Sequence, residues 1–138
     1  MGYTLPRPML ETGYNVPHVD RTDILFLVTS VGRVQELSLD FVIADRHALL
    51  AHAQFSADTA QLSTLSWDLW NARDFKYDPE EPGKKERYQA EFLVHRYLPT
   101  SAIREIACYN RDVEERIGSM LQGRGETTRV EIHEDWYF

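Results

Sequence analysis

Short apolar runs alternate with polar segments along the whole chain, and they predict short strands and helices in mixed order. Residues 23–30 and 39–44 form compact apolar runs of the kind found in buried strands. The first run is apolar on both faces, so we expect it to be central in a sheet. Residues 106–110 and the alternating segment 129–133 predict two further strands. This order indicates an α+β fold with a mixed or antiparallel sheet.

Helical patterns fall between these strands. Residues 30–36 predict a short helical turn, and residues 48–55 predict a short helix because they are rich in Ala and Leu. Residues 111–121 carry an apolar stripe at helical spacing, and Gly123 closes that helix.

Residues 84–99 join a basic cluster to an apolar run, and the strand predicted there covers 89–96. Glu91 stands at the head of the run, where a carboxylate is costly to bury unless it is paired or open to a cleft. Strand alternation places Glu91 on the same face as His95.

The residues alone leave two interpretations of Glu91 open. One is a structural ion pair with Arg87 or Arg96, which is the more common arrangement for a single glutamate. The other is a carboxylate that stabilises a cationic transition state.

Composition narrows the class of protein. A length of 138 residues predicts one domain, and a net charge of −7 from 22 acidic and 15 basic residues argues against non-specific duplex binding. A local basic groove remains compatible with that charge. The single cysteine, Cys108, is expected to be a buried core thiol in a reducing compartment. The chain has no apolar run of transmembrane length and no signal-peptide layout, so we expect a cytoplasmic protein without a membrane partner.

Motifs for other chemistries do not occur in the sequence. The five histidines lack the spacing of a zinc site, and there is no nucleophile elbow, P-loop or dinucleotide-binding glycine motif. Trp67 and Trp70 precede the basic cluster, where they suit either stacking on unpaired bases or packing of a helix on the core. The turn at residues 45–47 suits either ligand binding or plain solvation.

Several segments, taken as an ordered set, resemble the DarT family, whose members are bacterial toxins that ADP-ribosylate thymidine in single-stranded DNA with NAD. The resemblance rests on residues 6–10, 24–31, 41–48, Phe55, 65–68, 87–94 and 136–137. The segment Q-A-E-F-L-V at 89–94 is fairly specific, and the ordered set is more specific than any one piece.

The resemblance implies an ADP-ribosyltransferase fold, a mixed split sheet with short helices, and NAD as the co-substrate without a metal. It implies that Glu91 is the catalytic residue, and that residues 70–87 form the substrate-recognition loop. Within the segment that leads to Glu91, the predicted DNA contacts are Lys84, Lys85 and Arg87. Weaker predictions for residues that line the substrate site are Arg7, Asp45 and His47.

Members of the family are longer at the amino terminus. We therefore expect residues 1–138 to form a single DarT-like domain that lacks the family's amino-terminal NAD-binding segment. The resemblance also implies a macrodomain antitoxin of the DarG type as a partner, and an exposed sheet edge suggests a homo-oligomer. The alternative hypothesis is a catalytically impaired relative that binds single-stranded nucleic acid or the antitoxin.

Overall fold

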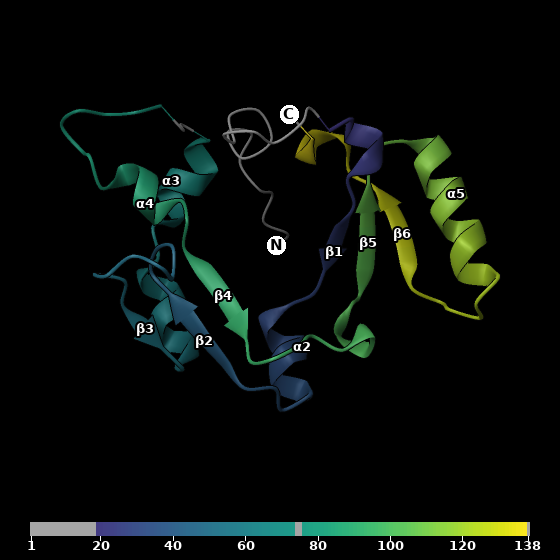
Figure 1. Ribbon diagram of the computed structural model, residues 1–138, viewed down its shortest axis with the longest axis horizontal. Helices are drawn as coiled ribbons and strands as arrows, with labels where there is room; N and C mark the ends of the chain where they lie inside the picture. The colour runs from purple at the N-terminus through teal and green to yellow at the C-terminus, as the bar shows by residue number, and fades with distance from the viewer. Residues whose placement is uncertain (1–18, 74–75, 138) are drawn as a thin grey trace. The chain divides into compact units, whose positions relative to one another are not determined.

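The chain folds into two compact units, each built on a three-stranded sheet (Figure 1). The computed structural model describes residues 19–73 and 76–137. The first unit joins the described residues of Met1–Ser38 to those of Pro99–Phe138, and the second unit is Leu39–Leu98. Small sheets with short helices confirm the α+β class and the split sheet that we predicted.

The sheet of the first unit has the order β1-β5-β6. Strand β5 (Glu105–Cys108) pairs antiparallel with β1 (Phe26–Val28) and parallel with β6 (Arg129–Ile132). All four residues of β5 are buried, because the strand has a neighbour on both sides. The sheet is therefore mixed, as predicted.

The prediction that the first apolar run is central in a sheet is wrong for the part of the chain that the structure describes. There β1 pairs with β5 alone and lies at the sheet edge, and Leu27 is 63% exposed. An apolar run indicates that both faces of a strand are apolar, but it does not indicate how many strands pair with that strand.

The helices of the first unit begin at side-chain caps. Ser30 Oγ accepts the Arg33 N–H at 3.1 Å and starts α2 (Val31–Glu36), while Asn110 Oδ1 accepts the Val113 N–H at 3.1 Å and starts α5 (Arg111–Gln122). Helix α5 ends at Gln122 and is closed by Gly123, as predicted, and it lies beside β6 (Figure 1). Single 3₁₀ turns complete the unit at Arg21–Asp23, Thr100–Ala102 and Glu134–Trp136.

The core of the first unit is built around β5. Cys108, Val34 and Val113 are each at most 2% exposed, so Cys108 is the buried core thiol that we expected. The hydroxyl of buried Tyr137 lies 3.0 Å from each of two carbonyl oxygens, those of Ile24 and Ala107. Burial raises the pKa of Tyr137 to about 12. The tyrosine thus joins the chain end to β5 and to the segment before β1.

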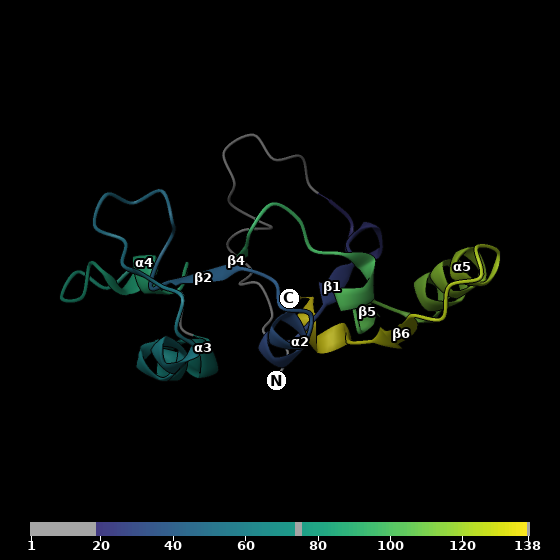
Figure 2. The same cartoon turned by 90° about the horizontal axis from the view of Figure 1, so that it is seen from below.

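The sheet of the second unit has the order β3-β2-β4, with both pairs antiparallel. Its strands are β2 (Phe41–Ala44), β3 (Phe55–Ser56) and β4 (Glu91–Val94), and its helical elements are a 3₁₀ helix at Thr59–Thr64, α3 (Trp67–Ala72) and α4 (Lys84–Arg87). Helix α3 lies on one side of the β2–β4 pair (Figure 2). Trp67 and Trp70 meet edge to face within α3, with ring centroids 4.8 Å apart.

The helix predicted over residues 48–55 does not form. The chain makes successive turns there and returns as β3, with Phe55 opposite Ala44. The Asp45 carboxylate accepts the Gln54 N–H at 2.9 Å, and the Asp45 N–H reaches the Gln54 carbonyl at 3.2 Å. These contacts hold both ends of the segment together, so tertiary pairing overrides the helix propensity of Ala and Leu.

Candidate functional site

The second unit brings the end of one strand to the start of another. In the antiparallel β2–β4 pair, Ala44 at the end of β2 lies opposite Glu91 at the start of β4. The polar turn at residues 45–48 follows directly after Ala44. Segments more than forty residues apart in sequence therefore place polar side chains around one carboxylate.

The Glu91 carboxylate is held by the turn and remains open to solvent. Its Oε2 accepts the backbone N–H of Ala48 at 2.8 Å and lies 3.9 Å from Nδ1 of His47. The Glu91 side chain is 35% exposed. Among the described residues, both polar contacts fall on Oε2, so Oε1 is left to accept a hydrogen bond from a ligand.

His47 faces Glu91 through a nitrogen that already has a donor. Nδ1 accepts the Leu49 N–H at 3.2 Å, so a neutral His47 ring carries its proton on Nε2. Nε2 is then a donor on a side chain that is 40% exposed. The structure thus brings Glu91 and His47 together, two residues that the sequence singled out separately.

The partners expected for Glu91 from sequence spacing lie elsewhere. Arg87 pairs with Glu81, and His95 lies 4.0 Å from Asp40. Within the described residues no arginine forms an ion pair with Glu91. The structural ion pair with Arg87 or Arg96 is therefore not formed. Residue 95 lies beyond the end of β4, so the strand alternation that linked it to Glu91 does not extend that far.

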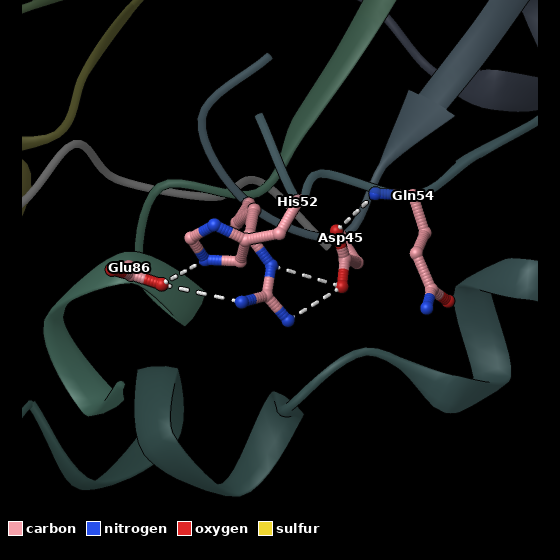
Figure 3. A network of polar contacts seen from close by, with 5 residues as sticks. Asp45, His52, Gln54 and Glu86 are labelled. Carbon is pink, nitrogen blue, oxygen red and sulfur yellow. Dashed lines mark hydrogen bonds and ion pairs between the residues drawn. The ribbon is translucent and has the colours of Figure 1, made fainter. Parts of the chain in front are cut away.

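A polar network joins the same turn to α4 (Figure 3). Arg46 donates from Nε and Nη2 to Oδ2 of Asp45, at 3.1 and 2.9 Å, and from Nη1 to Oε2 of Glu86 at 3.2 Å. His52 Nε2 lies 2.8 Å from the same Glu86 oxygen, and Gln54 donates its N–H to the other oxygen of Asp45. Both oxygens of the Asp45 carboxylate therefore accept hydrogen bonds from protein groups.

Both carboxyl groups of the network favour the ionised form. The hydrogen bond from Arg46 lowers the pKa of Asp45 and outweighs the opposing effect of burial. The contact with His52 is the main cause that lowers the pKa of Glu86, and Arg46 adds to it. In return, the hydrogen bond to Asp45 raises the pKa of Arg46. Asp45, Glu86 and Arg46 are therefore charged at neutral pH.

The three cations predicted to contact DNA differ in accessibility. Lys84 is buried, with 7% of its surface exposed, whereas Lys85 is exposed. Arg87 is one-third exposed and pairs with Glu81. Burial argues against direct phosphate contact by Lys84, because a phosphate reaches the ammonium only by displacing what covers it. Lys85 is the most accessible of the three.

Other predictions fall outside this cluster. Arg7 lies outside the described residues. No group of metal-ligating side chains occurs within residues 19–73 and 76–137, and in the same ranges no helix is long and apolar enough to cross a membrane. A polar hollow of about 720 Å³ in the first unit contains none of the predicted site residues and is lined by Thr100, Ser101, Ile103, Arg104, Glu126, Thr127, Thr128 and Arg129.

Sequence reasoning missed two parts of the site. The Ala48 N–H is a backbone group, and no sequence pattern marks it as a partner of a carboxylate 43 residues away. The Arg46–Glu86 contact joins a turn to a helix across 40 residues, and only the polar character of the segment A-D-R-H gave a signal.

Comparisons with known proteins identify the family of this chain. The family described as "ssDNA thymidine ADP-ribosyltransferase, DarT" matches residues 6–138. A "DNA ADP-ribosyl transferase" of Thermus sp. (strain 2.9) is 38% identical over 117 residues, which cover 83% of this chain and 54% of that protein. A protein of the same description from Escherichia coli O127:H6 is 34% identical, over 84% of this chain and 53% of its own length. The chain spans about half the length of these curated relatives.

Solved structures of DarT proteins match the fold of this chain. The structure "Thermus sp. 2.9 DarT in complex with NAD+" matches 97% of this chain and 65% of its own, with a TM-score of 0.78 and 34% identity. The structure of that protein in complex with ADP-ribosylated ssDNA also has a TM-score of 0.78, at 33% identity and with 61% of its chain covered. The fold is therefore that of the DarT ADP-ribosyltransferases. The chain belongs to the DarT family, which confirms the resemblance in its sequence.

Proposed function

We propose that this chain transfers ADP-ribose from NAD to thymidine bases of single-stranded DNA, with Glu91 as the catalytic residue. The observation that carries this proposal is the Glu91 carboxylate, which is fixed by the Ala48 N–H at 2.8 Å and yet 35% exposed. Membership of the DarT family supports this chemistry. Relatives described as bound to NAD+ and to ADP-ribosylated ssDNA supply the substrate classes.

The chemistry suits a carboxylate of this kind. Transfer breaks the bond between C1′ of the nicotinamide ribose and the nicotinamide nitrogen, whose bonding electrons leave with neutral nicotinamide. The ribose develops oxocarbenium character, which a fixed anion nearby stabilises. The anion is pre-oriented, because Ala48 holds Oε2 and leaves Oε1 to accept a ribose hydroxyl.

The second half of the reaction forms the bond between C1′ and N3 of thymine. N3 is a poor nucleophile until it loses its proton, so the step releases that proton to water and is assisted by a group that stabilises the deprotonated base. His47 is proposed to line this part of the site, since it lies 3.9 Å from Glu91 and its neutral ring keeps Nε2–H as a donor. That donor suits a thymine carbonyl oxygen. Asp45 is proposed to line the site only through the turn that it stabilises.

The DNA strand is proposed to reach the site over α4. Lys85 is exposed there, and Arg87 keeps one-third of its side chain in solvent. A positive charge on this helix offsets the net charge of −7 locally, as phosphate binding requires. We propose Lys85 as the main phosphate contact, with Arg87 beside it.

In the cell, we propose that the chain acts in the cytoplasm as the toxin of a toxin–antitoxin pair. The proposed partner is a macrodomain antitoxin of the DarG type, which would reverse or restrain the modification. A solved DarTG structure from Thermosipho africanus in complex with ADP-ribose matches this chain at 16% identity and a TM-score of 0.65, a likeness that concerns the fold alone.

Label transfer from NAD tests the enzymatic proposal. NAD labelled in its adenosine part is incubated with the chain and a single-stranded oligonucleotide that contains thymidine. We expect label on this oligonucleotide, much less on its duplex and none on a strand without thymidine. Glu91→Gln is the matched control that keeps a hydrogen-bond acceptor for Ala48 and removes the charge. Equal labelling by wild type and Glu91→Gln would overturn the proposal.

A binding-only function is the second candidate, and the observation that favours it is that the chain spans about half of its curated relatives. The same assay separates the two. Tight oligonucleotide binding that depends on Lys85, without label transfer by the wild-type chain, would favour the binding-only function.

A further inference from the structure

Arg46 has no role in the chemistry described so far, yet it is the centre of the network beside the site. Its side chain is 22% exposed, and three of its nitrogens donate to carboxylates. A guanidinium is a planar and rigid set of donors, so partners on two sides of it are held at a fixed separation. Here the two partners, Asp45 and Glu86, belong to the turn and to α4.

The contacts form a closed ring that includes the Glu91 carboxylate. Residues 47 and 48, which face Glu91, directly follow Arg46 in the chain. Glu86 lies on α4, five residues before Glu91. The ring therefore runs from Arg46 through the turn to Glu91, back along the chain to Glu86, and across the 3.2 Å contact to Arg46. Loss of the Arg46–Glu86 contact opens it.

We propose that Arg46 is a positioning residue that fixes the turn at residues 45–48 against α4, and thereby sets where Ala48 and His47 meet Glu91. This inference rests on the proposed function for its catalytic consequence, although the geometry that it describes is independent of the reaction. Displacement of reacting groups by about 1 Å can cost on the order of 100-fold in rate. Arg46, which fixes the turn next to the proposed catalytic carboxylate, therefore affects kcat more than KM.

Arg46 also connects the turn at residues 45–48 to the helix that carries the proposed phosphate contacts. Lys85 and Arg87, the proposed phosphate contacts, flank Glu86 on α4. The residue that fixes the turn thus holds the helix over which the DNA is proposed to arrive. His52 contacts Glu86 as well, since its Nε2 lies 2.8 Å from the Glu86 oxygen that Arg46 contacts.

The kinetic test compares Arg46→Gln with Glu86→Gln and with the double variant. Each single variant is expected to lower kcat at least about tenfold, with a smaller change in KM for the oligonucleotide. The double variant is expected to lose no more than the worse single variant, because both changes open the same ring. Arg46→Lys is expected not to restore kcat, since one ammonium does not reproduce the three donors.

The matched control is Arg111→Gln, which removes an arginine–glutamate contact of 2.6 Å in the first unit. It is expected to leave kcat and KM unchanged. A rise in KM alone for Arg46→Gln would overturn the proposal, because it would place the arginine in substrate binding. Additive losses in the double variant would also overturn it.

A second readout does not depend on activity. The Ala48 amide is bonded to Glu91, so its hydrogen exchange followed by NMR reports the geometry that Arg46 is proposed to hold. Arg46→Gln is expected to reduce the protection of this amide at least about tenfold, while amides of β5 keep theirs. Unchanged protection at Ala48, or an equal loss in β5, would refute the positioning role. If the wild-type chain transfers no ADP-ribose, the proposed function fails and this exchange measurement still decides the role of Arg46.

Discussion

Two substitutions of Glu91 separate its role in the fold from its proposed role in the chemistry. The carboxylate accepts one backbone N–H at 2.8 Å and is 35% exposed. A hydrogen bond to a charged group contributes about 1.5–3 kcal/mol to stability, and a neutral one contributes about 1 kcal/mol. Solvent access at Glu91 favours the lower end of the first range.

Glu91→Gln keeps an acceptor for the Ala48 N–H, so it is expected to lower the free energy of unfolding by about 1 kcal/mol or less. Glu91→Ala leaves that N–H to water, so it is expected to cost about 1–2 kcal/mol. Domains of this size are stable by about 5–15 kcal/mol, and both variants should therefore be folded at 25 °C. The loss of a fixed charge at the transition state, by contrast, costs about 100- to 1,000-fold in rate.

Urea unfolding and label transfer, measured on the same preparations, check this reasoning. Both variants should unfold with the slope of the wild type and lose at least 99% of the transfer activity. A Glu91→Gln variant that is destabilised by more than about 3 kcal/mol would refute it, because Glu91 would then be chiefly a structural residue. A folded Glu91→Ala variant that keeps a tenth of the transfer activity would also refute this reasoning.

Three further predictions concern other parts of the chain. Lys85→Ala should weaken oligonucleotide binding and reduce the slope of log K against log salt by about 0.7, whereas Arg124→Ala in the first unit should change neither in a fluorescence titration. Burial alone would raise the pKa of Glu105, but the hydrogen bonds from Arg129 and His133 outweigh burial and hold this pKa below its usual value of 4.5. The contribution of Glu105 to stability is therefore present above pH 4.5 and is lost as the pH falls through the lowered pKa. Urea unfolding from pH 6 to pH 3 should show this loss in the wild type and less of it in Glu105→Gln. Tyr137→Phe should lower the free energy of unfolding by about 1 kcal/mol, and no change would show that its hydroxyl contacts do not stabilise the fold.

The sequence predicts the elements of this fold well where local signals agree. Helix α5 has a cap at Asn110, an apolar stripe and a closing Gly123, and it forms as expected. Strands β2, β5 and β6 follow from their apolar or alternating runs. Pattern reasoning fails where tertiary pairing decides. The segment after the polar turn has helical composition, but its hydrogen bonds to Asp45 direct it into turns and β3.

The candidate site, like the fold, could be predicted from the sequence only in part. Glu91 can be found from its position at the head of an apolar run and from the Q-A-E-F-L-V segment. Its surroundings cannot be read from spacing, because they come from a turn more than forty residues away in sequence, through a backbone N–H and an imidazole. Strand alternation indicated His95, whereas the structure supplies His47. The register of β2 with β4, which sets Ala44 opposite Glu91, makes that difference.

The most direct test of the central claim is the intact mass of a single-stranded oligonucleotide with one thymidine, after incubation with the wild-type chain and NAD. We predict a gain of one ADP-ribose per strand, located on the thymidine by fragmentation, and an unchanged mass with Glu91→Gln. An unmodified oligonucleotide from a chain shown to be folded, or a modification located on another base, would contradict the claim.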